Sequence, residues 1–434
     1  MGASTPHERL KKTAQHLIEQ VLPRPRPLGV RFWDGSLLPP EVPREDTVIL
    51  VLKRPEVLAR LLEPPLDLAL GEAYLEGDFD VEGNLEKALE IAESLTPRLN
   101  PLEWAGVLRD ATSLKKGLKA LGVAARLKGR AHSKERDRQA IQHHYDVSNR
   151  FYRLWLDQRM VYSCAYFPQG DEDLDQAQEN KLELVLKKLR LQPGERLLDV
   201  GAGWGGLIVY AAERYGAQAL GVTLSKRQVE HARAVIAENG LEDRVQIELR
   251  DYRDVRGPFD KAASIGMAEH VGREKLPEYF RTLYQALRPG GLLLHHVITR
   301  GPVPPRFSKT VASGEFMRRY VFPDGEILPL WTHLKAAEEA GFEVCDVEDL
   351  RPHYAKTLRH WVARLEARFA EAVREVGAAR ARLWRLYMSA SAYQFAAGHL
   401  AIHQVLLAKP NAKGQAAVPP SRADLYIGGG YGGR

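Results

Sequence analysis

The pattern of apolar and polar residues changes near residue 141, and this change divides the chain into two parts. In the first part, the run Thr47–Leu52 is typical of a short strand, and Pro55–Leu62 predicts a small helix. A further helix is predicted where apolar residues recur every three or four positions, at Leu85, Ala88, Leu89, Ala92 and Leu95. Residues 1–110 are therefore predicted to form a small α+β domain.

In the second part, residues 141–410, short apolar runs alternate with amphipathic helical segments. The runs that predict strands are Arg196–Val200, Ala219–Leu224, Arg244–Leu249, Lys261–Gly266 and Gly291–Ile298. This alternation predicts an α/β fold with a doubly wound, Rossmann-like parallel sheet. Prolines from Pro302 to Pro305 interrupt the pattern, so the segment up to Leu328 is expected to cap the sheet as an insertion. Residues 411–434, rich in Gly and Pro, predict a flexible tail.

Residues 111–140 join the two parts and carry many basic side chains. Leu114, Leu118, Leu121 and Ala125 lie at helical spacing there, which predicts a basic amphipathic helix able to lie in a lipid interface. A solvated linker explains the same charges. The cations are Lys115, Lys116, Lys119, Arg126, Lys128, Arg130, Lys134, Arg136 and Arg138.

Composition narrows the setting in which the protein works. The 434 residues contain no uncharged apolar run of about 18 residues, which argues against a membrane span. Residues 1–20 are polar and lack a signal-peptide core, so a cytoplasmic location is expected. Cys164 and Cys345 are the only two cysteines, and they do not predict a disulfide framework. The formal charge of +6 favours anionic partners. Phospholipid headgroups are favoured over nucleic acid, because no aromatic residues are interleaved with the basic run to stack on bases.

A glycine-rich loop follows the first strand of the second part, in the sequence Leu-Asp-Val-Gly-Ala-Gly-Trp-Gly-Gly from Leu198 to Gly206. A purely structural turn would explain a lone G-x-G, but here the loop joins a strand to a helix. A dinucleotide site would need an acid at the end of the next strand, and Thr223-Leu224-Ser225 supplies none. Asp199 before the glycines instead suits the cationic methionine end of S-adenosylmethionine. Asp251 and Tyr252, after the third strand, suit its adenine.

Polar and aromatic residues also follow or precede the other strands. They lie in Tyr162–Tyr166, Met267–Gly272, His295–Ile298 and His353–Tyr354. Taken singly, Cys164 could be a small core residue, His296 a hydrogen-bonded core histidine and Tyr354 a packing residue. Glu269 is harder to explain structurally, because an unpaired carboxylate after a buried strand is costly.

Together these motifs resemble cyclopropane fatty acid synthases and their mycolic acid relatives. The motifs Tyr-Ser-Cys-Ala-Tyr, Leu-Asp-Val-Gly-Ala-Gly-Trp-Gly-Gly, Gly-Val-Thr-Leu-Ser, Glu-His-Val-Gly and Tyr-Val-Phe-Pro-Asp-Gly occur in the family's order. The resemblance covers residues 142–409 and reaches the first part weakly, through Leu70–Tyr74. That extension favours the long, two-domain, lipid-acting form over the short mycolic acid enzymes.

The resemblance implies roles for individual residues. Those implied to hold S-adenosylmethionine are Tyr162, Ser163, Gly201, Gly203, Thr223, Leu224, Gln228 and Tyr252. Those implied to hold a bicarbonate ion beside the reacting methyl group are Cys164, Glu269, His296, Ile298 (through its backbone) and Tyr354. No metal is implied. Some relatives carry Trp at the position of Tyr252, and Leu350–Tyr354 looks more like actinobacterial fatty acid methylases than the best-known cyclopropane synthases.

The implied reaction transfers a methyl group to the cis double bond of an unsaturated phospholipid acyl chain. The resulting carbocation needs a dry pocket, with Tyr166, Phe322 and Phe395 as candidate aromatic partners. Glu269 would accept the O–H of bicarbonate, and His296 and Tyr354 would donate to its oxygens. Proton loss from the added methyl closes a cyclopropane ring, whereas loss from a neighbouring chain carbon gives a methylene branch.

Two other functions remain open at this point. One is a methyltransferase acting on a small amine or carbon acid, and the other is a membrane-surface or nucleic-acid-binding protein with an inactive methyltransferase fold. For the lipid-acting function, we expect peripheral association with the inner face of the membrane through anionic headgroups. Homodimerisation is implied by the family.

Overall fold

The computed structural model describes residues 11–42, 47–57, 66–94, 127–304 and 314–426, apart from isolated positions inside these ranges. The helices predicted at Pro55–Leu62 and from Leu114 to Ala125 fall almost entirely outside the described residues. No helix in the described ranges combines the length and apolar character that a membrane crossing requires.

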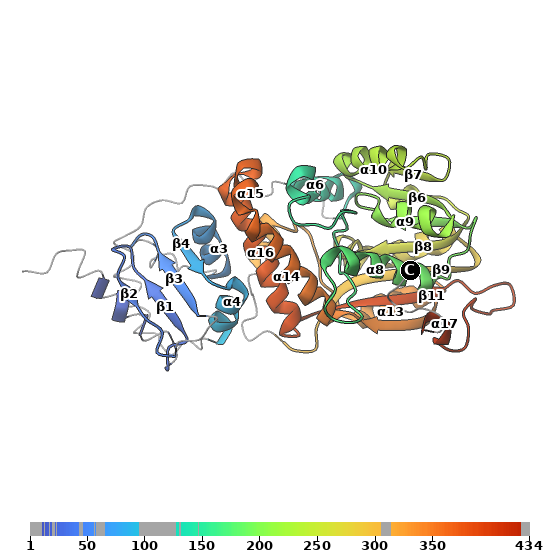
Figure 1. The fold of residues 1–434 in the computed structure, drawn as a ribbon. Helices are drawn as coiled ribbons and strands as arrows, with labels where there is room; N and C mark the ends of the chain where they lie inside the picture. The colour runs from blue at the N-terminus through green and yellow to red at the C-terminus, as the bar shows by residue number, and fades with distance from the viewer. Residues whose placement is uncertain are drawn as a thin grey trace, which may run out of the picture. The chain divides into compact units, whose positions relative to one another are not determined.

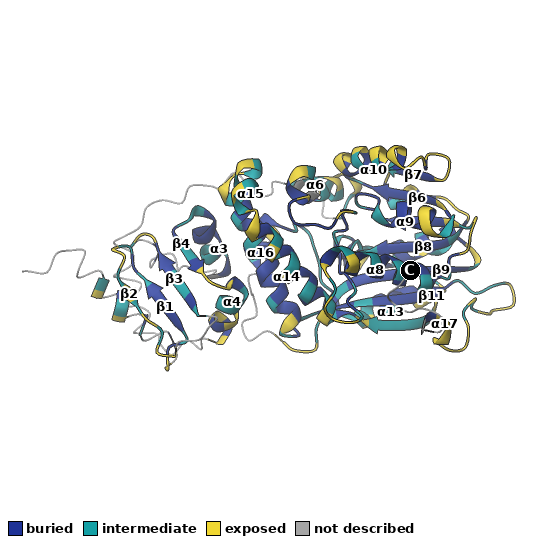
Figure 2. Ribbon diagram, viewed as in Figure 1, coloured by how far each residue is buried: buried dark blue, intermediate teal, exposed yellow. Residues whose placement is uncertain are grey.

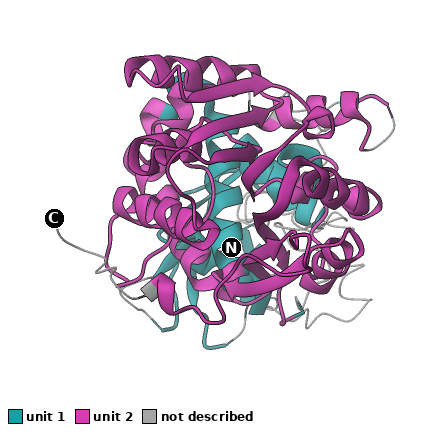
Figure 3. Ribbon diagram, turned by 90° about the vertical axis from the view of Figure 1, so that its right-hand side faces the viewer, with its two compact units in different colours: residues 1–124, 304–321, 372–394 teal, residues 125–303, 322–371, 395–434 magenta. Residues whose placement is uncertain are grey.

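The chain forms two compact units, which Figure 3 colours separately. Unit 1 comprises residues 1–124, 304–321 and 372–394. Unit 2 comprises residues 125–303, 322–371 and 395–434.

Unit 1 contains a four-stranded sheet in the order β2-β1-β3-β4 (Figure 1). Its elements are β1 (Leu28–Arg31), β2 (Leu37–Leu38), β3 (Val48–Leu52), α3 (Leu66–Glu76), β4 (Phe79–Glu82) and α4 (Leu85–Ser94). β1 and β3 run parallel, whereas β2 and β4 pair antiparallel with their neighbours. The strand predicted at Thr47–Leu52 and the helix predicted from Leu85 are confirmed by β3 and α4.

Two segments from late in the sequence complete unit 1, namely α12 (Glu315–Tyr320) and residues 378–394 of α16 (Ala378–Ala396). The first segment was expected to cap the larger sheet, and the second was expected to belong to the catalytic domain. Hydrogen bonds explain the difference, because the Tyr320 hydroxyl donates to Glu72 at 2.6 Å. The Arg382 guanidinium likewise donates to the Tyr74 carbonyl at 2.6 Å.

Unit 2 is built on a seven-stranded sheet in the order β10-β11-β9-β8-β5-β6-β7. Figure 1 labels β11, β9, β8, β6 and β7 of this sheet. Its strands are β5 (Arg196–Val200), β6 (Gln218–Thr223), β7 (Val245–Leu249), β8 (Phe259–Ile265), β9 (Leu287–Arg300), β10 (Glu343–Asp349) and β11 (Leu400–Ala408). The first five correspond to the five predicted strands and are parallel. The last two were not predicted, and both pair antiparallel, so the sheet is mixed.

Helices cover both faces of the larger sheet. On one face lie α8 (Leu174–Leu189), α9 (Gly206–Tyr215) and α10 (Lys226–Glu238), whose apolar side chains share one buried cluster with the strands. On the other face lie α11 (Leu276–Ala286) and α13 (Leu330–Glu339), which belong to a second buried cluster. The strands between them are largely buried (Figure 2), as expected for a sheet covered on both faces.

The remaining elements of unit 2 surround this sheet. They are α6 (Lys134–Tyr145), α7 (Asn149–Tyr152), η1 (Tyr252–Asp254), η2 (Ala268–His270), η3 (Arg273–Lys275), α14 (Arg351–Ala367) and α17 (Ala423–Tyr426). Helix α15 (Phe369–Val376) is divided along the sequence, with residues up to 371 assigned to unit 2 and those from 372 to unit 1. The described end of the predicted basic linker forms helix α6. Its cations pair within unit 2, Lys134 with Asp254 at 2.7 Å and Arg136 with Asp324 at 2.8 Å.

The prediction of a flexible tail at 411–434 is wrong for residues 411–426. Ala416 and Val418 pack against the core of unit 2, and Arg190 pairs with Asp424 at 2.8 Å between Nε and Oδ2. Arg422 also forms an ion pair with Asp346. The polar composition suggested disorder, but these ion pairs and apolar contacts fix the segment. Residues 427–434 lie outside the described part of the chain.

Candidate active site

The glycine loop joins the end of β5 to the start of α9. Gly201, Gly203 and Gly205 have φ values of +81°, +55° and +89°, a region that side chains with a Cβ rarely adopt. At Gly201 space is also limiting, because an added Cβ would lie 3.0 Å from Met267 Cγ. The loop therefore needs glycine both for its backbone conformation and for the close approach of the segment after β8.

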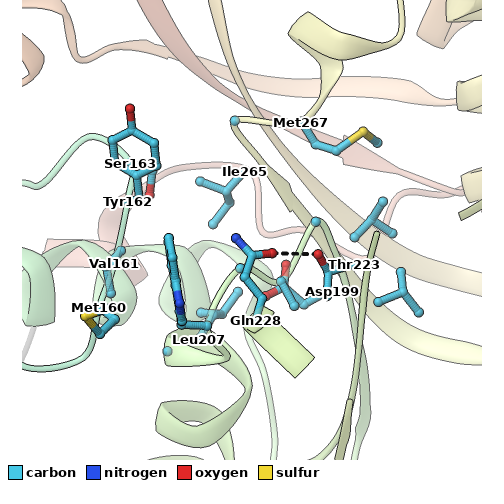
Figure 4. A pocket seen from close by; sticks show the side chains of 18 of the residues that line it. Met160, Val161, Tyr162, Ser163, Asp199, Leu207, Thr223, Gln228, Ile265 and Met267 are labelled. Carbon is cyan, nitrogen blue, oxygen red and sulfur yellow. Dashed lines mark hydrogen bonds between the residues drawn. The ribbon is translucent and has the colours of Figure 1, made fainter. Parts of the chain in front are cut away.

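A pocket opens above this loop, at the carboxyl ends of the parallel strands (Figure 4). Nine of the ten residues predicted to bind the cofactor line it, namely Tyr162, Ser163, Asp199, Gly201, Gly203, Thr223, Leu224, Gln228 and Tyr252. Asp251 is the exception. Its carboxylate accepts from the Arg253 backbone N–H at 2.9 Å and pairs with the Arg253 guanidinium at 2.7 Å, so it caps η1.

Gln228 and Thr223 are joined by a hydrogen bond on one side of the pocket. The Thr223 hydroxyl donates to the Gln228 side-chain oxygen at 2.6 Å, as the dashed line in Figure 4 marks. Ser225 caps α10 by accepting the Gln228 backbone N–H at 3.3 Å. The cap fixes where α10 begins, and this places Gln228 in its first turn, facing the pocket.

Lys181 lines the same pocket and was not among the predicted residues. It is 1% exposed, and its ammonium donates to the Ser163 hydroxyl at 2.9 Å. Burial lowers the pKa of Lys181 to about 8, although the nearby carboxylate of Asp157 opposes this shift. Burial raises the pKa of Asp199 to about 7, against the opposing charge of Lys181. In the sequence, Lys181 is marked only by its position on the apolar face of α8, among residues that are buried.

Glu269 lies on η2, between the pocket residues Met267 and His270. Its Oε1 accepts the Ile298 backbone N–H at 2.6 Å. Ile298 lies two residues after His296, the last residue of β9 that pairs with β8. Its Oε2 is buried and has no hydrogen-bond partner among the described residues. Burial raises the pKa of Glu269 to about 7, despite the hydrogen bond from Ile298.

His296 lies on β9, opposite Ile265 of β8, and is completely buried. Its Nδ1 is 3.2 Å from the side-chain nitrogen of Gln404, and its Nε2 has no partner within the described ranges. Burial, reinforced by the charges of Lys181 and Lys188, lowers the pKa of His296 well below its usual value. The imidazole is therefore neutral near pH 7.

Cys164 and Tyr354 both contact the backbone carbonyl of Leu350, directly before α14. Both are buried, at 0% and 7% exposed. Cys164 Sγ lies 3.2 Å from the Ala165 carbonyl and 3.8 Å from the Leu350 carbonyl, and the Tyr354 backbone N–H donates to that same Leu350 oxygen at 3.1 Å. Burial raises the pKa of the Cys164 thiol, so it stays protonated and does not act as a nucleophile.

The charge of Lys181 affects both the cofactor pocket and the second group of predicted site residues, which comprises Cys164, Glu269, His296 and Tyr354. It acts on Asp199 in the cofactor pocket and also on Cys164 and His296. Among the predicted site residues, Glu269 Oε2 and His296 Nε2 are buried without a partner in the described part of the chain, and such atoms suit a small polar ligand because buried polar atoms normally have partners.

The three aromatic residues predicted to face the carbocation lie in different surroundings. Phe395 is buried beside Tyr354, with ring centroids 4.6 Å apart. Phe322 packs on His144 and His270, at 4.3 and 5.7 Å. Tyr166 packs on His353 at 4.8 Å. Phe395 is thus in direct contact with a predicted site residue.

Comparison with known proteins places this site in a family context. Residues 132–405 match the family model described as mycolic acid cyclopropane synthetase, and residues 15–96 match a domain of unknown function. A probable fatty acid methyltransferase of Pseudomonas putida is 41% identical over 402 residues, covering 92% of this chain and 96% of that protein.

Two further relatives differ in how much of the chain they cover. The tuberculostearic acid methyltransferase UfaA1 of Mycobacterium tuberculosis is 32% identical over 417 residues, covering 93% of this chain and 90% of that protein. The crystal structure of the mycolic acid cyclopropane synthase CmaA1, complexed with SAH and CTAB, superposes with a TM-score of 0.59 at 34% identity. That superposition covers 62% of this chain and 97% of the CmaA1 chain.

Proposed function

The chain belongs to the mycolic acid cyclopropane synthetase family, and from this premise we propose that it methylates the cis double bond of unsaturated phospholipid acyl chains. Its larger unit has the fold of class I S-adenosylmethionine-dependent methyltransferases, so the methyl donor is S-adenosylmethionine. The observation that carries the proposal is the pair of buried, unpartnered atoms Glu269 Oε2 and His296 Nε2, close in the fold to the cofactor pocket. A methyltransferase acting on an amine has no need of such a pair.

The residues of the pocket hold the donor and its methyl group in place. Asp199 and Tyr162 would contact the methionine end, and Tyr252 the adenine. An alkene is a neutral nucleophile with no proton to remove, so the first step requires alignment of the double bond with the sulfonium methyl. Attack forms the new C–C bond, releases S-adenosylhomocysteine and leaves a cation on the other alkene carbon.

Glu269, His296 and Tyr354 would serve the next step, in which the carbocation loses a proton. Bicarbonate, when bound, supplies the base that takes a proton from the added methyl group. Glu269 Oε2 would accept the O–H of the ion, while His296 Nε2 and the Tyr354 hydroxyl would donate to its oxygens. The Ile298 backbone N–H acts by holding Glu269 at 2.6 Å. Burial of Cys164 and Tyr354 keeps water from the cation.

A cyclopropane fatty acid is the proposed product, and a methylene-branched chain is the alternative. The alternative is supported by the extent of the similarity. The relatives that match more than nine-tenths of this chain are named for fatty acid and tuberculostearic acid methylation, whereas the CmaA1 superposition covers 62% of it. The two outcomes differ only in which C–H faces the base.

We further propose that the chain is the long, lipid-acting form, in which unit 1 and the basic segment at 111–140 bind the membrane surface. The +6 net charge and the match of residues 15–96 to a separate domain support this assignment. The protein would then act at the inner face of the membrane, on phospholipids with anionic headgroups. A homodimer is expected from the family.

The proposal is tested by incubating the purified protein with methyl-labelled S-adenosylmethionine, bicarbonate and phospholipid vesicles. Vesicles with cis-unsaturated chains should take up label in the acyl chains, and vesicles with saturated chains should not. Vesicles without anionic lipid should be methylated more slowly. Label that appears only in small amines or carbon acids added to the mixture would support the rival methyltransferase function instead.

A further inference from the structure

Three polar side chains form a row across three neighbouring strands of the larger sheet. Glu348 of β10 pairs with Gln404 of β11, and Gln404 pairs with His296 of β9. His296 and Gln404 lie on the same face as Leu294 and Leu406, because side chains alternate along a strand. That face is covered by α8. The two strands added antiparallel to the parallel sheet thus bring Glu348 and Gln404 into line with a predicted site residue.

Lys188 of α8 joins this row from above. It is 2% exposed, its ammonium donates to the Gln404 side-chain oxygen at 2.8 Å, and it forms an ion pair with Glu348. Gln404 itself is completely buried. An ammonium group can only donate, so the oxygen of the Gln404 amide must face Lys188. The amide nitrogen is then turned toward His296, where the distance to Nδ1 is 3.2 Å.

This orientation determines where His296 carries its proton. The Gln404 amide nitrogen is a donor, so Nδ1 of His296 must be the acceptor and can hold no hydrogen. A neutral imidazole then has its hydrogen on Nε2, which is the atom without a partner among the described residues. We propose that Lys188 and Gln404 are positioning residues that fix His296 as the Nε2–H tautomer.

The consequence for catalysis rests on the proposed function. His296 can donate to an oxygen of the bound anion only if Nε2 carries hydrogen. In the other tautomer, Nε2 would present a lone pair to an oxygen lone pair, and the anion would be held less well. Lys188 and Glu348 never need to touch the anion, because they act through the orientation of one amide.

The first experiment measures the tautomer itself, by nitrogen-15 NMR of the imidazoles, with His296 assigned by comparison with His296→Gln. In the wild-type protein, the hydrogen should be on Nε2. In Gln404→Glu, a carboxylate faces Nδ1, so the hydrogen should move to Nδ1. Wild-type protein with hydrogen on Nδ1, or Gln404→Glu with hydrogen still only on Nε2, overturns the proposal.

The second experiment measures turnover at saturating S-adenosylmethionine and bicarbonate. Gln404→Glu should lower kcat roughly 100-fold, while the Kd for S-adenosylmethionine stays within about twofold of wild type. Lys188→Met frees the amide to rotate, so it should lower kcat roughly 10-fold and populate both tautomers. Lys187→Met is the matched control, since this neighbour on α8 forms its ion pair with Glu183 at 3.4 Å, and it should leave both readouts unchanged.

The two experiments separate the failure of this inference from failure of the proposed function. If Gln404→Glu does not fold, the wild-type spectrum and Lys188→Met still decide the tautomer. If no acyl chain is methylated by any variant, the proposed function fails, and the NMR result stands by itself. Methylation by Gln404→Glu at the wild-type rate would contradict the positioning role.

Discussion

Glu269 and His296 each use one polar side-chain atom in a hydrogen bond within the protein. The other polar atom of each side chain is buried without a partner among the described residues. Glu269 is held by the Ile298 N–H, and His296 faces Gln404. Glu269 is hydrogen-bonded to Ile298, two residues after His296 on β9. A buried polar atom without a partner costs about 1–3 kcal/mol, and a ligand that bonds to both atoms would remove this cost. The proposed bicarbonate gives each of them a partner.

The raised pKa of Glu269, about 7, predicts a pH dependence of turnover. Below that pH the side chain is protonated and no longer accepts the O–H of the anion, so kcat should fall as the pH decreases from about 8 to about 6. His296 stays neutral over this range, because its pKa is lowered well below the usual value. The measurement is kcat against pH, with the bicarbonate concentration held constant and S-adenosylmethionine saturating, which removes the titration of Asp199 in the cofactor pocket.

Glu269→Gln is the control for this profile. The amide does not titrate, so turnover should be lower by roughly 100-fold and flat over the same pH range. If the variant keeps the wild-type fall in kcat at low pH, another group is responsible and the assignment of Glu269 is wrong.

Among single residues, those whose chemistry is unusual for their position could be predicted from the sequence. Glu269 stood out because a carboxylate directly followed an apolar strand. Lys181, Lys188 and Gln404 did not stand out, because a lysine on a helix is ordinarily solvated and a glutamine on a strand is unremarkable. Their roles depend on which helix covers which strands, and only the three-dimensional arrangement supplies this.

At the scale of elements, the five parallel strands were predictable and the two antiparallel strands were not. Each parallel strand is a short apolar run followed by an amphipathic helix. In contrast, β10 at the sheet edge is acidic and only partly buried, and it does not read as a strand. β11 is apolar, but it follows the long helix α16, and its pairing with β9 connects residues about a hundred positions apart.

Helix α16 provides a prediction for unit 1. Arg382 of this helix donates to the carbonyls of Tyr74 and Phe79, at 2.6 and 2.8 Å, and pairs with Asp80 at 2.8 Å. Arg382→Ala removes these charge-assisted bonds, so it should lower the stability of α3 and β4 by roughly 2–3 kcal/mol. Hydrogen exchange of residues 66–82 measures this directly, as faster exchange of protected amides.

The matched control is Arg374→Ala on α15, where the side chain is exposed. It should change the same exchange rates little, because surface substitutions usually stay within about 0.5 kcal/mol. Equal exchange in wild type and Arg382→Ala would show that α16 does not stabilise α3 and β4.

At the scale of the whole molecule, the sequence predicted two parts but not how the chain is shared between them. Residues 304–321 and 372–394 return to unit 1 after the chain has entered unit 2. No local sequence pattern indicates which unit a helix packs in, so the sequence did not predict that these segments belong to unit 1. The tail was also misjudged, because its ion pairs Arg190–Asp424 and Arg422–Asp346 join residues far apart in the chain.

The central claim, methyl transfer to lipid acyl chains, is tested most directly by mass spectrometry of phospholipid fatty acids from a host that produces this protein. Wild-type protein should convert unsaturated chains into chains heavier by one CH2 group, with a cyclopropane ring or, in the alternative, a methylene branch. Glu269→Gln produced at the same level should give far less of this product. Fatty acids of unchanged mass in a host that accumulates folded wild-type protein able to bind S-adenosylmethionine would contradict the account.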